Sequence, residues 1–376
     1  MIYLDNSATT AVDEAVVEAM LPWLTKNYGN ASSIYSLGRA ARVAVEDARA
    51  EIAHLLGAHP AEIFFTSGGT ESNNTIIKSV LHESDLADAV CVSPTEHHAV
   101  LEPAHSAVGG GKGLYVLPVD ADGRVTVSEV PAVNRRRTLV SVMHANNETG
   151  VVQPVYDVRQ AAPDVYLHSD AVQSFGKITV KVDDLGVDFL SVSAHKIHGP
   201  KGIGAMYIRK GIDFKAHQHG GAQERNRRAG TEPVHLIVGF QVAARRAAAD
   251  LEHRATVMME RTRQLREGIA REIPNIRVNT PETGVLPNII NISFLDAERL
   301  DGEGILQALD MAGLAVSNGS ACVSGSQQPS HVLLAMGRSK AEALAAVRLS
   351  VSYTTTQEEI FSAITILADV IREMRG

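Results

Sequence analysis

The sequence of 376 residues contains only two cysteines, Cys91 and Cys322. So few cysteines exclude a disulfide framework and suit a reducing compartment; Cys91, inside a short apolar run, is expected to be a buried strand residue. No apolar run approaches the roughly 20 residues that a membrane-spanning helix needs. The N-terminus shows neither a charged leader nor the apolar core of a signal peptide. We therefore expect a cytoplasmic protein whose partners do not include a membrane.

The common motifs for binding nucleotides and metals are missing as well. Neither GxGxxG nor GxxxxGK[ST] occurs, so nucleotide binding has little support. Among fifteen histidines, His195 and His198 form one of several close pairs, but no pair has a companion cysteine or the HExxH spacing. We therefore expect no structural or catalytic metal ion. The net charge of −8 argues against nucleic acid and favours a small molecule or a protein as partner.

Helical periods alternate with short strand-like runs between about residues 36 and 209. This alternation predicts an α/β domain with a largely parallel sheet. In such sheets, ligands bind beyond the carboxyl ends of the strands. The expected helices cover 38–57 and 72–83, and the expected strands cover 62–67, 88–93, 113–119, 138–145, 164–170, 188–194 and 204–210.

A long amphipathic stretch, 234–273, follows the last of these strands and is expected to form two helices or one bent helix. The remainder mixes expected strands with expected helices, which predicts a smaller α+β module. We expect a large domain of residues 12–251 and a small domain of residues 1–11 and 252–376. The small domain would carry a loop at about 318–330 that includes Cys322. The strands expected there cover 276–280, 288–294 and 348–353, and the helices cover 303–313 and 358–374.

Lys196 follows a predicted strand and precedes Gly-Pro in the stretch SVSAHKIHGPKG. Three interpretations compete: a solvated turn lysine, a His-x-x-His metal site, or a lysine that does covalent chemistry. Asp170 and Gln173 follow a neighbouring predicted strand, and Gly68–Thr70 lies between a strand and a helix, where backbone amides can hold a phosphate. Pyridoxal phosphate needs a lysine amine, an anion beside its pyridine nitrogen and phosphate ligands. This cofactor explains the pattern best.

Seven motifs then occur in order along nearly the whole chain: TSGGTESNN, TEHHAV, MHANNETGVVQP, HSDAVQSFGK, SAHKIHGPKGIGAMYI, RRAGTEPVH and NGSACVSGS. Together they resemble the cysteine desulfurases of the NifS/IscS type, in the class V aminotransferase branch of fold-type I pyridoxal-phosphate enzymes. The resemblance implies a homodimer that converts L-cysteine to L-alanine and leaves a persulfide on Cys322. The sulfur would pass to an acceptor such as a NifU- or IscU-like scaffold or another carrier, for iron–sulfur clusters or related sulfur biosynthesis.

The resemblance also implies a role for each matching residue. Lys196 would bind the cofactor and later move the Cα proton, Cys322 would attack the substrate sulfur, and His97 would stack on the ring and act as acid or base. Cys322 could also ligate an iron–sulfur cluster transiently. The other implied contacts are the pyridine nitrogen for Asp170, the phenolic oxygen for Gln173, the phosphate for Gly69, Thr70, Ser193 and His195, the phosphate of the partner subunit's cofactor for Thr231, and the substrate carboxylate for Asn147 and Arg348, with Asn147 also at the cofactor.

The chain departs from the family pattern at Asn226, where glycine is expected, and at Asn318, where serine is common. It also ends without the extended tail of housekeeping IscS members, which favours a NifS-like or specialised desulfurase. A class V aminotransferase or a selenocysteine lyase on the same scaffold is the nearest rival, and Cys322 separates these reactions from desulfuration. A third possibility is a non-catalytic sulfur-trafficking component. The presence of Lys196, Asp170, Gln173 and Arg348 together argues against it, because a binding protein has no need of all four.

Overall fold

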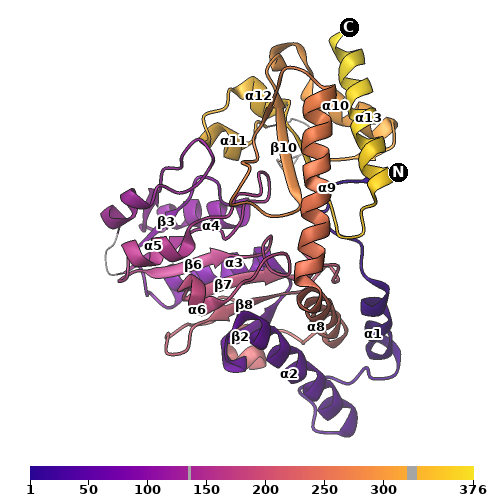
Figure 1. Cartoon of the computed structure of the whole chain (residues 1–376). Helices are drawn as coiled ribbons and strands as arrows, with labels where there is room; N and C mark the ends of the chain where they lie inside the picture. The colour runs from indigo at the N-terminus through magenta and orange to yellow at the C-terminus, as the bar shows by residue number, and fades with distance from the viewer. Residues whose placement is uncertain (134–136, 320–327) are drawn as a thin grey trace.

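A seven-stranded sheet forms the centre of the computed structural model, which describes residues 1–133, 137–319 and 328–376 (Figure 1). Its strands are β2 (Ile63–Thr66), β3 (Ala89–Val92), β4 (Gly113–Val116), β5 (Thr138–Ser141), β6 (Tyr166–Asp170), β7 (Phe189–Ser193) and β8 (Gly204–Ile208). They lie in the order β2-β8-β7-β6-β5-β3-β4. Strand β8 pairs antiparallel with β2 and with β7, and the other four strand pairs of this sheet are parallel. The predicted mostly parallel sheet is therefore confirmed.

The central strands divide their apolar side chains between two cores, one on each face of the sheet. Phe64 and Phe189 belong to one core, whereas their neighbours Phe65 and Leu190 belong to the other. This follows from the two-residue period of a strand, and buried apolar residues at consecutive positions indicate a sheet covered on both faces. The helices of this part are α1 (Glu14–Thr25), α2 (Ser36–Leu56), α3 (Gly69–Lys78), α4 (His98–Gly109), α5 (Val155–Ala161), α6 (Val182–Leu185), α7 (Gln223–Asn226) and α8 (Val234–Ala249).

The C-terminal part of the chain builds a second, smaller sheet with its own core (Figure 1). Its antiparallel strands lie in the order β12 (Val347–Ser350), β10 (Ile289–Phe294) and β9 (Ile276–Val278). The N-terminal strand β1 (Ile2–Tyr3) pairs with β11 (Leu314–Ala315), so the first residues join this part. The helices here are α9 (Leu251–Glu272), α10 (Gly302–Met311), α11 (His331–Ala335), α12 (Lys340–Leu344) and α13 (Gln357–Arg375).

The long amphipathic stretch forms two helices, which was one of the two predicted forms. Helix α8 ends before Asp250, whose backbone is not helical (φ −113°, ψ 19°), and α9 begins at the next residue. Helix α9 then extends from the larger sheet towards the smaller one (Figure 1). The two separate cores support our proposal that residues 12–251 form one domain and that residues 1–11 with 252–376 form another.

Several element boundaries differ from the predicted ones. The helix predicted for 72–83 already begins at Gly69, and its last residues, Ser79–Glu83, form a π-helical turn. Helix α4 contains Pro103, a residue that normally breaks helical patterns, which explains why no helix was expected there.

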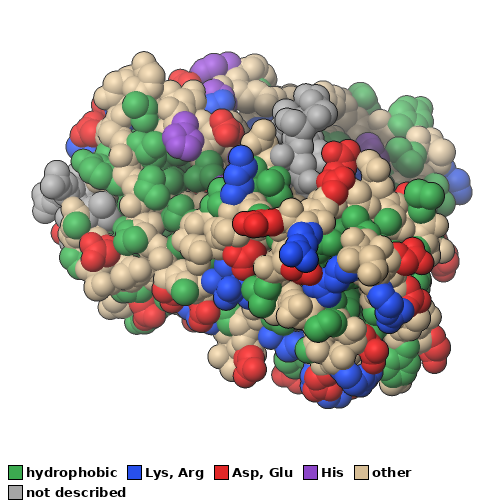
Figure 2. Space-filling view, turned by 90° about the horizontal axis from the view of Figure 1, so that it is seen from above, with side chains coloured by type: hydrophobic (Ala, Val, Ile, Leu, Met, Phe, Trp, Pro, Cys, Tyr) green, Lys and Arg blue, Asp and Glu red, His purple; other side chains and the backbone are tan. Residues whose placement is uncertain are grey.

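The surface carries charged side chains of both signs (Figure 2). On the face shown in Figure 2, Lys and Arg side chains are interspersed with Asp and Glu side chains, as the modest net charge of −8 would suggest. Within the described ranges, no helix is long and apolar enough to cross a membrane.

Candidate active site

A cavity of about 350 Å³ lies where the parallel strands of the large sheet end. The segments that follow β2, β3, β5, β6 and β7 supply much of its wall, and β12 and the N-terminal segment supply more. Parallel strands present their carboxyl ends at one edge, so residues far apart in sequence meet there. The predicted site residues that line the cavity are Gly69, Thr70, His97, Asn147, Asp170, Gln173, His195, Lys196 and Arg348.

Lys196 lies in a short 3₁₀ turn directly after β7. Its Nζ donates hydrogen bonds to the carbonyl oxygens of Ser7 (2.5 Å) and Ala8 (2.7 Å). Burial, reinforced by the positive charge of Arg348, lowers the pKa of Lys196 to about 8. A lysine with this pKa is partly neutral near physiological pH, and only a neutral amine is a nucleophile.

Asp170, the last residue of β6, is fixed by two donors. Asn73 Nδ2 lies 2.6 Å from Asp170 Oδ2, and the Val172 amide donates to Oδ1 over 2.9 Å. The carboxyl group is buried but lines the cavity. Gln173, in the following turn, donates from Nε2 to the Ser7 carbonyl over 2.9 Å.

His97 is the N-cap of α4, and its Nδ1 accepts a hydrogen bond of 3.0 Å from the Ala99 amide. This bond leaves Nε2 as the protonated nitrogen of the neutral ring. Burial lowers the pKa of His97, although the negative charge of Asp170 opposes the shift. The His97 side chain is exposed at the cavity wall, and a neutral imidazole there suits stacking against a ring and proton transfer.

The two histidines beside Lys196 bind different protein groups. The Nδ1 atom of His195 lies 3.2 Å from Thr9 Oγ1, whereas His198 Nε2 lies 2.8 Å from Ser352 Oγ. Burial lowers the pKa of His195 to about 4, so this ring is neutral at pH 7. Outside residues 134–136 and 320–327, the chain shows no cluster of three or more His, Cys, Asp or Glu side chains suited to a metal ion.

Arg348 reaches the cavity from β12 of the smaller sheet. Its guanidinium group donates to Asp5 Oδ1 (2.7 Å) and to the carbonyl of Asn147 (2.9 Å). Its buried Nε has no hydrogen-bond partner in the described part of the chain. A buried, unpartnered donor is costly. Asn147 itself also lines the cavity.

A tight turn of glycines forms the wall of the cavity at the start of α3. Gly68 has φ +149° and, as the N-cap, offers no side-chain acceptor to the first amides of the helix. A Cβ on Gly69 would lie 2.6 Å from Val172 Cγ2, so a larger residue would not fit. Ser193 is buried behind this turn: its Oγ lies 3.8 Å from the position of a Cβ on Gly68. Ser193 does not line the cavity itself.

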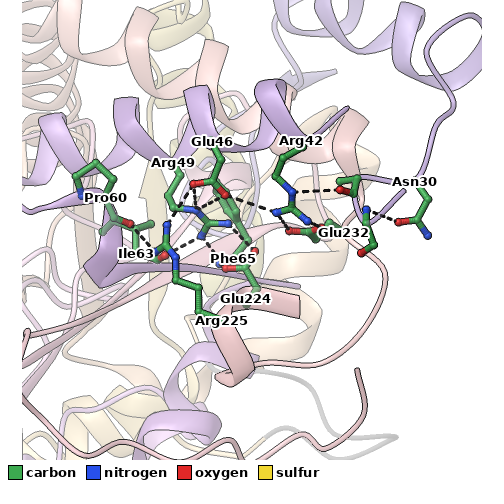
Figure 3. Close-up of polar contacts among 12 residues, drawn as sticks. Asn30, Arg42, Glu46, Arg49, Pro60, Ile63, Phe65, Glu224, Arg225 and Glu232 are labelled. Atoms are coloured by element: carbon green, nitrogen blue, oxygen red, sulfur yellow. Dashed lines mark hydrogen bonds and ion pairs between the residues drawn. The ribbon is translucent and has the colours of Figure 1, made fainter. Parts of the chain in front are cut away.

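Thr231 is exposed and lies outside this cavity, against a separate one of about 80 Å³. The segment that carries it is held by three ion pairs in which an arginine binds both oxygens of a glutamate. These pairs are strong because their geometry matches two parallel hydrogen bonds. They are Arg49–Glu224 (2.7 and 2.9 Å), Arg42–Glu232 (2.9 and 2.8 Å) and Arg228–Glu71 (2.7 and 3.1 Å), of which Figure 3 shows the first two.

Asn226 ends a run of three residues with positive φ in this segment; its own φ is +62°. Among residues with a Cβ, asparagine tolerates this region best, which explains how it replaces glycine here.

We expect Asn226→Gly to change the free energy of unfolding by less than about 1 kcal/mol. Asn226→Val should cost about 1–2 kcal/mol, because a β-branched residue resists this conformation. Urea unfolding of the three proteins measures this, and equal stability of the Val variant and the original would contradict it.

Cys322 and most of its predicted loop lie outside the described residues. The residues that flank it meet at Glu148. A Cβ on Gly319 would lie 2.8 Å from Glu148 Oε2, and Ser330 Oγ donates to the same oxygen over 2.5 Å. Gly319 also lines the cavity. Asn318 is buried, and its Nδ2 finds no partner within the described chain.

Several residues that line the cavity were not predicted as site residues from the sequence. Asn73 is on the same face of α3 as Gly69, so helical spacing could have indicated it. Ser7 and Ala8 act through backbone carbonyls, for which side-chain patterns give no signal. The full set not named is Ser7, Ala8, Asn73, Met143, Ala145, Val172, Ser317 and Gly319.

Comparison with known proteins confirms the resemblance carried by the motifs. The aminotransferase class-V family model matches residues 2–362. The chain is 44% identical over 382 residues to the cysteine desulfurase IscS of Dictyoglomus turgidum, covering 100% of this chain and 95% of that protein. It is 41% identical over 379 residues to the cysteine desulfurase NifS of Azotobacter vinelandii, with 100% and 94% covered. A solved NifS-like protein superposes with a TM-score of 0.91 at 36% identity, covering 99% of both chains. The chain therefore belongs to the class-V aminotransferase family and, within it, to the cysteine desulfurases of the IscS and NifS type.

Proposed function

We propose that this protein converts L-cysteine to L-alanine with pyridoxal phosphate bound in the cavity and Cys322 as the first acceptor of the sulfur. The observation that carries the proposal is Lys196, a half-buried amine whose pKa is lowered to about 8, within a cavity that also presents Asp170, His97 and Arg348. Relatives of the whole chain are named cysteine desulfurases. The persulfide would pass to a scaffold or carrier protein for iron–sulfur clusters or related products.

The residues around the cavity fit pyridoxal phosphate. The glycine turn before α3 leaves the first helical amides without a side-chain acceptor, and such amides bind phosphate well. Asp170, held by Asn73, would pair with the pyridine nitrogen, and His97 would stack on the ring. Gln173 would contact the phenolic oxygen, and Gly69, Thr70, His195 and the nearby Ser193 would hold the phosphate. When bound, the cofactor supplies an electron sink that makes the Cα proton of an amino acid acidic.

The chain's own residues then divide the remaining work. Arg348 would bind the substrate carboxylate, with Asn147 beside it, because both line the cavity. Lys196 would remove and return the proton at Cα, because an amine with a pKa near 8 can do both near neutral pH. His97, kept neutral by burial, would exchange a proton close to the ring.

The sulfur step balances without an external oxidant. The thiolate of Cys322 would attack the sulfur of the substrate, forming an S–S bond while the Cβ–S bond breaks. The electron pair of the broken bond stays on Cβ, which takes up a proton and becomes the methyl group of alanine. A thiol and a cysteine thus give a persulfide and alanine, and a later acceptor removes the outer sulfur.

We also propose that the protein forms a homodimer. Thr231 lies away from the cavity of its own chain and is exposed, so a second copy could bring its own cofactor phosphate to it. The three ion pairs would hold Thr231 in place for that contact.

The deciding experiment is the conversion of L-cysteine by the purified protein loaded with pyridoxal phosphate, in the presence of a thiol reductant. Alanine and sulfide should form in equal amounts. Loaded protein that forms pyruvate, or transfers the amino group to a keto acid, would instead indicate the aminotransferase chemistry of the wider family. Protein that forms neither alanine nor sulfide would contradict the proposal.

The pKa of Lys196 leads to a prediction on cofactor loading. Burial lowers this pKa from an ordinary 10.5 to about 8, so the neutral amine predominates above pH 8 rather than above pH 10.5. The rate at which the apoprotein takes up pyridoxal phosphate should therefore rise about tenfold per pH unit below 8 and level off above it. Stopped-flow absorbance between pH 6 and 10 measures this rate, with N-acetyl-lysine as the reference amine. A midpoint near that of the reference would contradict the prediction.

A further inference from the structure

Lys177 is a buried lysine for which the proposed reaction gives no role. It follows Gln173 by one turn, in the tight segment after β6, and only 5% of its surface is exposed. Its Nζ donates to two oxygens of one residue, the backbone carbonyl of Gln173 at 2.9 Å and the side-chain Oε1 of Gln173 at 3.1 Å. None of the ion pairs found in the described ranges includes Lys177. A buried lysine without a carboxylate is costly to keep.

The contact with Lys177 determines which way the Gln173 amide faces. The Lys177 amine donates to Oε1, so the amide nitrogen is turned to the opposite side. There Nε2 donates to the Ser7 carbonyl (2.9 Å), the same oxygen that accepts from Lys196 (2.5 Å). Lys177 and Lys196 are therefore joined by one hydrogen-bonded chain through Gln173 and Ser7.

A second contact region also joins the two lysines. Both line a small cavity of about 20 Å³ behind Lys196, which is room for about one water molecule. The segment is held close, because a Cβ on Gly176 would lie 2.7 Å from Ile197 Cγ2. The close packing of this segment against the Lys196 turn therefore fixes the positions of the side chains that both carry.

The charges around Lys177 are almost all positive. Burial, together with the positive charges of Lys196 and Arg348, lowers its pKa to about 7. Two carboxylates of the site are bound to other groups, Asp5 to Arg348 and Asp170 to Asn73. The ionisable groups that face Lys177 or share its small cavity are His195, Lys196, His198, Arg254, Arg348 and Tyr353.

We infer that Lys177 is a positioning residue, which holds the Gln173 amide with its nitrogen towards Lys196 and the cavity. The inference rests on the proposed function, in which Gln173 contacts the cofactor. Removing Lys177 would free the amide to turn its oxygen towards the Ser7 carbonyl and Lys196. An amide oxygen in place of the amide nitrogen favours protonation at Lys196, in the apoprotein and in the loaded protein.

Lys177→Gln tests the inference, because glutamine stays polar but is neutral and one atom too short to reach Gln173 Oε1. In the apoprotein, mass spectrometry after brief acetylation across a pH series gives the midpoint of Lys196 labelling, expected near pH 8 in the original. In the loaded protein, the visible absorption of the cofactor is titrated with pH. We expect Lys177→Gln to raise both midpoints by about one pH unit.

Lys181→Gln is the matched control, since Lys181 Nζ also binds two carbonyl oxygens, those of Leu55 (2.9 Å) and His54 (3.3 Å), but lies outside both cavities. It should leave both midpoints unchanged. Equal midpoints in Lys177→Gln and the original would overturn the inference, and so would equal shifts in the two variants. If Lys177→Gln does not fold, Lys177→Met is titrated in its place and should raise the visible midpoint. The apoprotein measurement needs no cofactor, so it stands even if the original protein does not bind pyridoxal phosphate.

Discussion

Replacing Cys322 by alanine should abolish the formation of alanine and sulfide from L-cysteine, while the visible spectrum of the bound cofactor stays unchanged. The reaction needs a thiolate to take the sulfur, and the sequence contains one other cysteine, Cys91. Cys91 cannot serve, because it is fully buried in the middle of β3 and burial raises its pKa to about 12. We expect kcat to fall by at least about 10³-fold, because no other group supplies the nucleophile.

Cys91→Val is the control for this experiment and should retain activity, because Cys91 acts as a small apolar residue of the core. Mass spectrometry after a single addition of L-cysteine without reductant should show one extra sulfur atom on the original protein and on Cys91→Val. The Cys322→Ala variant should show none. Full activity of Cys322→Ala, or extra sulfur on Cys91, would contradict the persulfide mechanism.

The sequence was informative wherever side-chain type and strand ends coincide. Lys196, Asp170 and Gln173 could be placed at one site because each follows a predicted strand, and parallel strands gather their carboxyl ends at one edge. The alternation of strands and helices between 36 and 209 likewise predicted the sheet that is found. Cys91 was expected to be a buried strand residue, and the structure confirms this.

Contacts made through the backbone, or across a large sequence distance, could not be predicted in this way. The Ser7 carbonyl, which joins Gln173 to Lys196, belongs to a segment near the N-terminus and gives no signal in its side chain. No role or burial was predicted for Lys177 from the sequence, because only the fold buries this side chain. Thr231 was expected, from the family resemblance, to contact a phosphate. It lies outside the large cavity of its own chain, so such a contact requires a second chain.

Arg49→Met should strongly destabilise the protein. Arg49 is buried in α2 and binds both oxygens of buried Glu224, at 2.7 and 2.9 Å, and the carbonyl of Ile63 at 2.7 Å (Figure 3). Glu224 also accepts from the Phe65 amide over 2.9 Å. Removing the arginine would leave a buried carboxylate without its counter-charge, which costs about 3–5 kcal/mol. The midpoint of urea unfolding should fall accordingly.

A double-mutant cycle separates the ion pair from the loss of packing. Arg49→Met combined with Glu224→Leu removes both charges, so the double variant should be more stable than Arg49→Met alone. Arg263→Met in α9 is the control, since Arg263 pairs with Glu260 and Glu267 on the exposed surface, where such pairs contribute little. Additive effects of the two core substitutions would show that the buried pair is not coupled. If the two substitutions are coupled, the stability lost in Arg49→Met is assigned to the Glu224 carboxylate left without its counter-charge. Glu224 is also the first of the three residues with positive φ that end at Asn226 and precede Thr231.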